Sequence, residues 1–393
     1  MKASPHAVDV IIIGAGQAGL SVSACLKDAG IAHQVLERDS PASSWKHRWD
    51  AFCLVTPNWS VRLPGEPYAG KEPHSFMGRD AVVAHLTDYA KRRCGPIQTG
   101  TEVRCVSTHG DDFAVHTQHD EWHARVVVVA TSTHAAPRLP AFASRLPSNI
   151  ASMHTAQYTN PQALAGGAVL VVGSGQSGAQ IAQELHESGR SVFLSTSAVG
   201  RVPRRYRGLD IIDWQARMGF LDRHVSDLDS PSARFRPDPQ LSGQRGGYTL
   251  DLRTLARDGV QLCGRLNDVD NAICRFDADC ESNLQYADEF SADLIQRIDA
   301  FIQDNALDVR APDRDNSDLG YDGEAVDIRA PATLDLRANG IETVLWATGF
   351  TRDLTFIDVP GFDPSVYPEH YECPEIRRLF FAGFNYVERR GSG

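Results

Sequence analysis

The sequence predicts an α/β fold that contains one strand–turn–helix–strand unit twice. The first observation is that two apolar runs, "VIII" before residue 14 and "AVLVV" before residue 173, each enter a glycine-rich turn and then a helical stretch. The second is that the two segments match at an offset of 159 residues. At that offset Gly30 aligns with Gly189, and each glycine ends a predicted helix before an extended run, "AHQVLE" or "SVFLST". Both segments are therefore predicted βαβ units with parallel strands.

The two turns, "GAGQAG" and "GSGQSG", have the G-x-G-x-x-G spacing of a dinucleotide-binding loop. The first glycine makes the turn, the second lets the backbone approach a pyrophosphate, and the third lets helix and strand pack closely. One such pattern is a weak signal, but two copies between a strand and a helix are specific and predict two Rossmann-like domains. The residues expected to bind the cofactors are Gly14, Gly16, Gln17 and Gly19 in the first loop and Gly173, Ser174, Gly175, Gln176, Ser177 and Gly178 in the second.

The two units differ at the end of the second strand, where the adenosine ribose is recognised. The first has Glu37, a carboxylate that accepts hydrogen bonds from ribose hydroxyls, as FAD requires. The second has no acid there, and Arg201, Arg204 and Arg205 follow. Guanidinium groups suit a ribose 2′-phosphate, so the second site is predicted to prefer NADPH, with NADH possible. The alternative is that these arginines form a solvated loop or meet another element.

The remaining elements follow from periodicity and turn residues. A helix is predicted over residues 78–93, followed by strands over 101–106, 113–117 and 122–132. Residues 226–247 are polar and loop-rich, and helices are predicted over 251–257 and 287–305. The last helix has an apolar face for packing, made of Phe290, Leu294, Ile298, Phe301 and Ile302.

Two strands that end in "VVVVATS" and "VLWATGF" are candidate crossings between the domains. The first crossing is marked by prolines at 137 and 140. We therefore predict a discontinuous FAD-binding domain over 1–165 and 330–393, with an NADPH-binding domain inserted over 166–329.

Composition limits the partners. The chain has 39 basic and 50 acidic side chains and a formal net charge of −11, which disfavours nucleic acid or an anionic membrane as a partner. No apolar run has the length of a membrane span. The 8 cysteines show neither metal spacing nor C-x-x-C, so we expect free thiols in a reducing cytoplasm, no metal site, and no disulfide reductase of the thioredoxin-reductase kind.

With these motifs assembled, the chain resembles the class B flavin-dependent monooxygenases. The resemblance is carried, in order, by "GAGQAG", Glu37, "SSWKHRW", "VVVATS", "GSGQSG" and "WATGF". "RWDAFCLVTPNW", "RVPRRYRG" and "LDLRTLARDGVQLCGRL" further resemble a bacterial subgroup of flavin-dependent oxidoreductases. The family implies that NADPH reduces FAD, that O₂ adds to give a flavin hydroperoxide, and that a small-molecule nucleophile, nitrogen or sulfur being favoured, takes one oxygen atom.

The resemblance also implies particular site residues. Asn58 is the candidate for a catalytic polar contact to the hydroperoxide, although "TPNW" is equally an ordinary turn. Trp45 is expected beside the flavin or in the core, and the backbone of Val103 against adenine. The crossings contribute the cofactor contacts Ala130, Thr131 and Gly349.

The chain departs from the family pattern in four places. Ser43 and Ser44 replace a Gly-Gly pair, Ser132 replaces the glycine of Ala-Thr-Gly, and the F-x-G-x-x-x-H fingerprint survives only as "SNIASMH". The sequence also ends at "LFFAGFNYVERRGSG", before the glycine turn and helix with which relatives close over the flavin pyrophosphate. Two rival functions therefore stay open: an NAD(P)H:flavin oxidase or reductase without oxygen insertion, and a non-catalytic nucleotide-binding redox sensor. Substrate and oligomeric state are not indicated.

Overall fold

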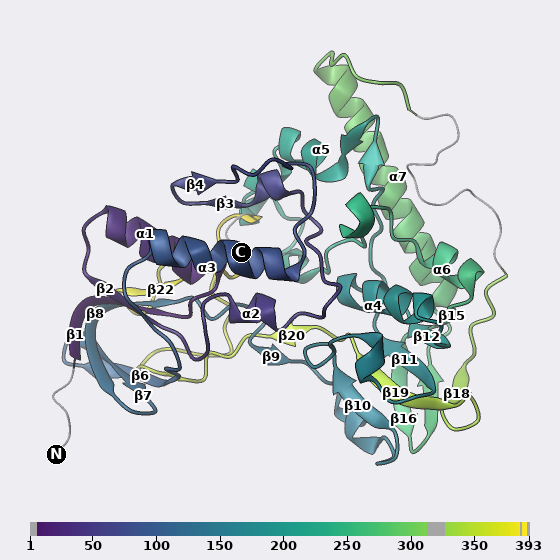
Figure 1. The fold of residues 1–393 in the computed structure, drawn as a ribbon, viewed down its shortest axis with the longest axis horizontal. Helices are drawn as coiled ribbons and strands as arrows, with labels where there is room; N and C mark the ends of the chain where they lie inside the picture. Colours follow the sequence, from purple (N-terminus) through teal and green to yellow (C-terminus); the bar gives the residue numbers. More distant parts are fainter. Residues whose placement is uncertain (1–5, 313–326, 386, 391–393) are drawn as a thin grey trace.

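The computed structural model describes residues 6–312, 327–385 and 387–390, which form two lobes, each built on a parallel or largely parallel sheet (Figure 1). The strands of the larger sheet run in the order β21-β6-β7-β8-β1-β2-β5, and β22 also pairs with β8. Their bounds are β1 (His6–Ile13), β2 (His33–Leu36), β5 (Ile97–Gln98), β6 (Val103–His109), β7 (Asp112–Thr117), β8 (Glu121–Val129), β21 (Ile357–Asp358) and β22 (Leu379–Phe381).

The second lobe holds a sheet in the order β10-β19-β11-β12-β15, all of whose pairings are parallel. A small antiparallel sheet, β16-β17-β18, packs beside it. The bounds are β10 (Ala151–His154), β11 (Ala168–Val172), β12 (Val192–Ser195), β15 (Gln261–Cys263), β16 (Leu266–Asp270), β17 (Ile273–Phe276), β18 (Thr333–Asp335) and β19 (Ile341–Trp346).

The central strands are uninterrupted apolar runs because both of their faces are covered. In β1, Ile11 and Ile13 belong to one buried cluster, while Val10 and Ile12 belong to another on the opposite face. In β11 the same alternation assigns Val169 and Val171 to one cluster and Ala168, Leu170 and Val172 to the other. Side chains of successive strand residues point to opposite faces, so a sheet buried on both sides requires this composition.

The helices confirm the predicted positions to within a few residues at most ends. The stretch over 78–93 is a helix from Arg79 to Arg93, and the long C-terminal helix begins at Cys280, earlier than expected. Residues 226–247 contain only short turns of 3₁₀ helix, as the polar composition indicated. The helix bounds are α1 (Gln17–Asp28), α2 (Ser43–Lys46), α3 (Arg79–Arg93), α4 (Gln176–Glu187), α5 (Ile211–Arg217), α6 (Leu252–Asp258) and α7 (Cys280–Asp304).

The strand pairing divides the chain differently from the expected domain ranges, 1–165 with 330–393 and 166–329. β10 lies in the second sheet beside β19, although it falls before residue 166. β18 and β19 also belong to the second lobe, although they fall after residue 330. The reason is that β19 is an apolar strand that completes the second sheet between β10 and β11, so the chain returns to the first lobe only after it.

The two crossings between the lobes run side by side. β9 (Ala136–Pro137) pairs in antiparallel fashion with β20 (Phe350–Thr351), and both lie between the lobes in Figure 1. The side chain and backbone N–H of Arg138 donate to the carbonyls of Thr348 and Gly349, at 2.9 and 3.0 Å. The crossings are therefore joined to each other by backbone and side-chain hydrogen bonds.

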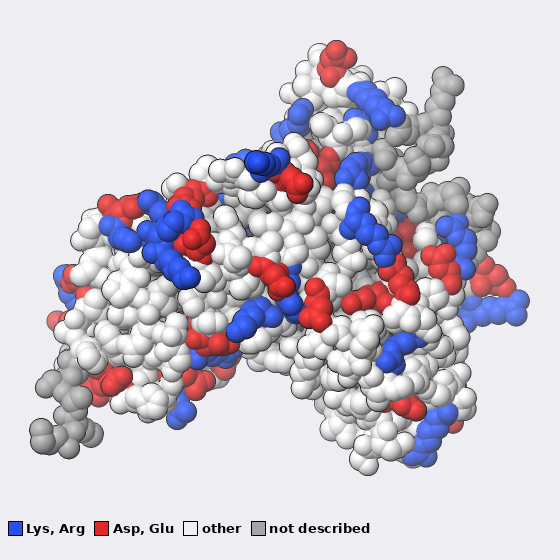
Figure 2. Space-filling view, viewed as in Figure 1, with Lys and Arg blue, Asp and Glu red and all other residues white. Residues whose placement is uncertain are grey.

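The surface agrees with the acidic, evenly mixed composition. On the face drawn in Figure 2, Lys and Arg are interspersed with Asp and Glu, and an indentation separates the lobes along the lower edge. The 8 cysteines are all free thiols, most of them buried. None of the helices in the described part of the chain is both long enough and apolar enough to cross a membrane.

Candidate functional site: two glycine loops and the junction between them

The first glycine loop shows a distinct steric reason for each of its three glycines. Gly14 follows β1 with φ of +105°, a conformation that side chains rarely adopt, and a Cβ there would lie 2.7 Å from the carbonyl oxygen of Ala130. A Cβ on Gly19 would lie 2.0 Å from the carbonyl oxygen of Gly14, so helix α1 approaches the turn as closely as glycine permits. At Gly16, by contrast, nothing lies within 4 Å of the added carbon. The middle glycine therefore faces open space at the N-terminus of α1.

The second loop repeats this geometry. Gly173 has φ of +103°, and its added Cβ would lie 2.7 Å from the carbonyl oxygen of Ala347. Gly178 is as crowded as Gly19, with 1.9 Å to the carbonyl oxygen of Gly173, and Gly175 again has nothing within 4 Å. Two of the three glycines are thus required by packing within the protein, whereas the middle glycine leaves open space at the helix N-terminus.

Glu37 lies beside the first loop, as the sequence predicts. It is buried at the end of β2, and its carboxylate accepts hydrogen bonds from the backbone N–H groups of Ala15 and Asp39 at 2.7 and 2.9 Å. Across the loop, the hydroxyl oxygen of Thr131 is buried and has no hydrogen-bond partner. Ala130 donates to the carbonyl of Ile13 at 2.9 Å. The loop thus has a fixed carboxylate on one side and an unused hydroxyl on the other.

The structure does not support the expectation that Arg201 and Arg204 bind a ribose phosphate. Arg201 is buried in ion pairs with Asp251 and Asp288, at 3.1 and 2.7 Å. The Arg204 guanidinium is buried against Asp210 and also donates to backbone carbonyls, one of them that of Val55 at 2.8 Å. Both guanidinium groups meet other elements of the chain, which was one of the alternatives considered for them.

Arg205 is the exposed member of this group, but it is also engaged. Its two terminal nitrogens donate to the carbonyls of Gly246 and Gly247, at 2.6 and 2.9 Å. None of the three arginines therefore presents an unoccupied guanidinium to the second loop.

A second group of residues lines a cavity beside the second glycine loop's sheet. A cavity of about 350 Å³ opens just beyond the carboxyl end of β12. Its lining residues are Ala198, Gly200, Arg236, Pro237, Tyr286 and Phe290. Tyr286 and Phe290 are exposed aromatic side chains on α7, and Arg236 is 63% exposed, with only a 3.8 Å pairing to Asp229. Phe290 was predicted as part of a packing face, so its exposure here was not anticipated.

The segment that follows Arg236 and Pro237 crosses the second glycine loop. The Gln240 side chain donates to the carbonyl of Ser174 at 2.6 Å, and the Gln176 side chain donates to the carbonyl of Pro239 at 2.6 Å. Gln17, the counterpart of Gln176 in the first loop, is exposed. The second loop is therefore partly covered by residues 239–241, while the first loop is more open. The two loops are alike in backbone and different in surroundings.

Asn58 has both ends of its side chain occupied. Its amide N–H donates to the carbonyl of Glu72 at 2.9 Å, and its oxygen accepts from the backbone N–H of Met77 at 2.8 Å. The residue is buried in a short 3₁₀ turn, Asn58–Ser60. These bonds support the turn alternative over a catalytic contact.

The other expected contacts are placed near the first loop or at the crossings. Trp45 lies on α2, which follows directly from Ala42, whose N–H donates to the carbonyl of Ala15 at 3.0 Å. Val103 begins β6. The Gly349 carbonyl accepts from the ring N–H of His154 at 2.9 Å, so this histidine fixes the second crossing.

One group that the sequence did not single out occupies the junction between the lobes. The Arg48 guanidinium carbon lies 5.8 Å from the ring centre of Phe52 and 5.7 Å from that of Phe350. The His134 ring, from the first crossing, lies 5.3 Å from Phe350, and burial followed by the positive charge of Arg48 lowers the pKa of His134 to about 4. Arg48 belongs to the motif "SSWKHRW", of which only Trp45 was predicted as a site residue, because a single arginine has no characteristic spacing.

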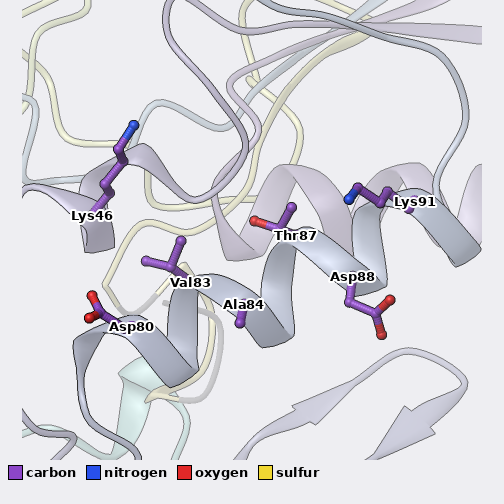
Figure 3. Close-up of a pocket in the computed structure, with 7 residues that line it drawn as sticks. All are labelled: Lys46, Asp80, Val83, Ala84, Thr87, Asp88 and Lys91. Atoms are coloured by element: carbon purple, nitrogen blue, oxygen red, sulfur yellow. The ribbon is translucent and has the colours of Figure 1, made fainter.

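A further cavity, of about 470 Å³, lies between α2 and α3 (Figure 3). Its lining residues are Lys46, Asp80, Val83, Ala84, Thr87, Asp88 and Lys91. No residue of either glycine loop or of the crossings is among them. The charges of its two lysines and two aspartates cancel, and the cavity is separate from the glycine loops and the crossings.

Fold and site together define a class of protein: an oxidoreductase with two Rossmann-like sheets, each carrying a glycine loop of the dinucleotide-binding type. A family model described as pyridine nucleotide-disulphide oxidoreductase matches residues 11–206, which contain both glycine loops. An uncharacterized CzcO oxidoreductase of Bacillus velezensis is 36% identical over 262 residues, covering 66% of this chain and 75% of that protein. The chain therefore belongs to the class B flavin-dependent monooxygenase family, as a flavin- and pyridine-nucleotide-dependent enzyme related to the CzcO oxidoreductases.

Other relatives extend the similarity in length and in chemistry. An uncharacterized CzcO-like oxidoreductase of Geobacillus kaustophilus is 29% identical over 392 residues, 98% of this chain and 94% of that protein. The rice indole-3-pyruvate monooxygenase YUCCA1 is 34% identical over 51% of this chain and 50% of that protein. A solved flavin-containing monooxygenase from Stenotrophomonas maltophilia has the same fold with a TM-score of 0.61 and 20% identity, over 97% of this chain and 91% of that one.

Proposed function

We propose that the protein is an FAD-dependent, NADPH-reduced monooxygenase that inserts one atom of O₂ into a small molecule, with nitrogen or sulfur as the favoured reacting atom. The observation that carries the proposal is the steric identity of the two loops. In each, two glycines are needed by the protein and the third, Gly16 or Gly175, leaves open space at a helix N-terminus. Unsatisfied N–H groups and the helix dipole make such a position an anion site. Two equal sites in one chain fit two dinucleotides.

The residues around the first loop fit FAD. The Glu37 carboxylate is fixed beside the loop by the N–H groups of Ala15 and Asp39, which supports a role in binding the adenosine ribose, and the buried Thr131 hydroxyl has no hydrogen-bond partner within the described residues. When bound, the flavin supplies the redox chemistry: it takes up a hydride from NADPH and activates O₂. The protein's own part is to hold the pyrophosphate at Gly16 and to exclude water from the junction between the crossings. We propose that the strands of the larger sheet form this FAD domain and that the chain from β10 to β19 forms the NADPH domain.

The cavity beyond β12 fits the adenosine 2′-phosphate of NADPH better than the arginines first expected to bind it. An acid at this position would select NADH, and the cavity has none. Arg236 offers a solvent-facing guanidinium, and Tyr286 and Phe290 offer aromatic faces to a purine. The proposed NADPH preference thus rests on residues that the chain supplies from α7 and from the segment before Gln240.

The test is a stopped-flow experiment with isotopically labelled oxygen. Protein loaded with FAD is reduced by NADPH without oxygen and then mixed with ¹⁸O₂, alone or with methyl phenyl sulfide or N,N-dimethylaniline. We expect the oxidised flavin spectrum to return slowly in buffer and faster with a substrate. The product should carry one ¹⁸O atom for each NADPH consumed.

The rival functions give different results in the same experiment. An oxidase would regenerate oxidised flavin at once and release one hydrogen peroxide per NADPH, without labelled product. A non-catalytic redox sensor would bind nucleotide and leave NADPH unoxidised. Either result would overturn the proposal.

A further inference from the structure

We infer that Arg48 binds the carboxylate of an organic acid at the junction between the lobes, so that the small molecule handled there is an anion with an apolar or aromatic body. The inference deepens the proposed function and rests on it only for the claim that the reaction takes place at this junction.

The Arg48 guanidinium lacks the polar partners that such a group normally has. Its Nε is buried without a hydrogen-bond partner, and within residues 6–312, 327–385 and 387–390 the guanidinium makes no hydrogen bond or ion pair. Its neighbours are instead the rings of Phe52 and Phe350. Burial lowers the pKa of Arg48 from its ordinary value, and no carboxylate offsets this effect. Arg48 as a whole is partly buried, and a partly buried cation without a counter-ion is unfavourable, so a ligand anion would supply the missing partner.

Arg48 lies between the two crossings that connect the lobes. Phe350 and His134 come from the two crossings, which follow directly from the carboxyl ends of β19 and β8. Arg48 and Phe52 belong to the segment that leaves the first glycine loop through α2. In sheets of this kind the ligand binds outside the carboxyl ends of the strands. Because both sheets present these ends at the junction, Arg48 lies where the reactive ends of two dinucleotides would meet.

The charge and the surroundings of Arg48 favour a carboxylate over a nucleotide phosphate. A pyrophosphate carries two charges and already has a helix N-terminus in each loop. Arg48 is a single cation with aromatic neighbours, and the pKa of the adjacent His134 is lowered to about 4, so this ring adds no second positive charge near neutral pH. One positive charge between apolar rings matches one negative charge on an apolar body. The planar guanidinium also pairs with both oxygens of a carboxylate.

The test compares two probes of nearly equal shape, 3-phenylpropionate and its uncharged amide, by isothermal titration calorimetry on the purified, flavin-loaded protein. We expect the carboxylate to bind at least 10-fold more tightly than the amide. Arg48→Met should remove this preference by weakening carboxylate binding about 10-fold or more while leaving amide binding unchanged. Arg48→Lys should keep part of the preference, because the charge remains without the planar fork.

The matched control is Lys46→Met, which removes a positive charge two residues away that faces the separate cavity of Figure 3. It should leave both affinities unchanged. Arg48→Met should also raise the Tm, because an uncompensated buried charge is removed, which shows at the same time that the variant is folded.

Three outcomes would overturn the inference: equal binding of the two probes to the unmodified protein, no binding of either, or an unchanged preference in Arg48→Met. If the variant instead weakens NADP⁺ binding and keeps the preference for the carboxylate, Arg48 serves a nucleotide phosphate. None of these results depends on turnover. Failure of the proposed function, seen as absence of NADPH oxidation, is therefore distinguishable from failure of this assignment.

Discussion

Ser132 is a residue whose identity and backbone conformation disagree. It has φ of +71°, and in the second crossing the equivalent position is Gly349 with φ of +80°. The first crossing thus has the backbone of an Ala-Thr-Gly turn with serine in place of glycine. A side chain in the left-handed region costs about 1 kcal/mol relative to glycine. The Ser132 hydroxyl accepts a hydrogen bond from the N–H of His134 at 3.2 Å, which offsets part of that cost.

We therefore expect Ser132→Gly to stabilise the protein by up to about 1 kcal/mol. The measurement is the free energy of unfolding in urea. Ser144→Gly is the control, because Ser144 is not among the residues with positive φ, so glycine there relieves no strain, increases the entropy of the unfolded chain and removes the exposed hydrogen bond to the carbonyl of Ala141. Equal destabilisation by both substitutions would show that the first crossing is not strained at Ser132.

The proposed preference for NADPH over NADH depends on one residue, Arg236. Arg236→Ala should raise the KM for NADPH about 10-fold, the effect of one charge-assisted contact at an exposed site, and should leave the KM for NADH nearly unchanged. Steady-state reduction of a flavin-loaded sample with each nucleotide measures both constants. Arg275→Ala, an exposed arginine on β17 outside the cavity, is the control. A similar rise for both nucleotides would remove Arg236 from the 2′-phosphate site.

Among the elements, α4 combines the second glycine loop with an unfavourably buried acid. Glu184 lies on this helix, and burial raises its pKa to about 7, with smaller contributions from Asp50 and Glu187. The Glu184 Oε2 and the Tyr158 hydroxyl are both buried without a well-formed hydrogen bond. In the folded protein the carboxyl is therefore protonated up to about pH 7, whereas in the unfolded chain it ionises near its ordinary value of 4.5.

Ionisation of Glu184 makes the free energy of unfolding depend on pH. Between about pH 4.5 and 7 the folded state binds more protons than the unfolded state, so Glu184 lowers stability as the pH rises. Glu184→Gln should stabilise the protein by roughly 2 kcal/mol at pH 8 and have little effect at pH 4.5. Urea unfolding at both pH values measures this, and Glu187→Gln is the control, because Glu187 lies three residues further along α4 and is exposed, where it pairs with Arg245. A pH-independent difference would mean that Glu184 is not the titrating group.

Some elements could be predicted from the sequence, whereas contacts between distant segments could not. β1, α1, β11 and α4 were predictable because glycine spacing and apolar runs are local properties of the chain. The partners of Arg204 were not predictable, because a charge pattern does not show that its guanidinium pairs with Asp210 and also reaches the carbonyl of Val55, which is distant in the sequence. The place of β19 in the second sheet, and of Arg48 between two crossings, likewise depends on long-range packing that periodicity does not contain.

For the whole molecule, the important property is that each lobe has its own core. The clusters around β1 and β8 contain residues of the larger sheet and its helices, whereas those around β11 and β19 contain residues of the second lobe, with Trp49 and Phe52 as additions from the first. The lobes meet through the paired crossings β9 and β20 and through contacts such as the Arg234–Glu369 ion pair at 3.1 Å. A change confined to the open space of one glycine loop should therefore not disturb the other lobe.

This independence leads to a paired prediction for the middle glycines. Gly16→Val should give a folded, colourless protein that still binds NADP⁺, and Gly175→Val a yellow protein that dithionite reduces and NADPH does not. Both positions have extended backbones and nothing within 4 Å, so valine fits the protein and blocks only a bound pyrophosphate. Gly19→Val and Gly178→Val are the contrasting controls and should prevent folding, because their side chains would overlap the carbonyls of Gly14 and Gly173. Absorbance at the flavin band and calorimetry with NADP⁺ measure the two sites separately. A yellow Gly16→Val protein would show that the first loop does not hold the flavin, and joint loss of both ligands in either variant would show that the lobes do not bind independently.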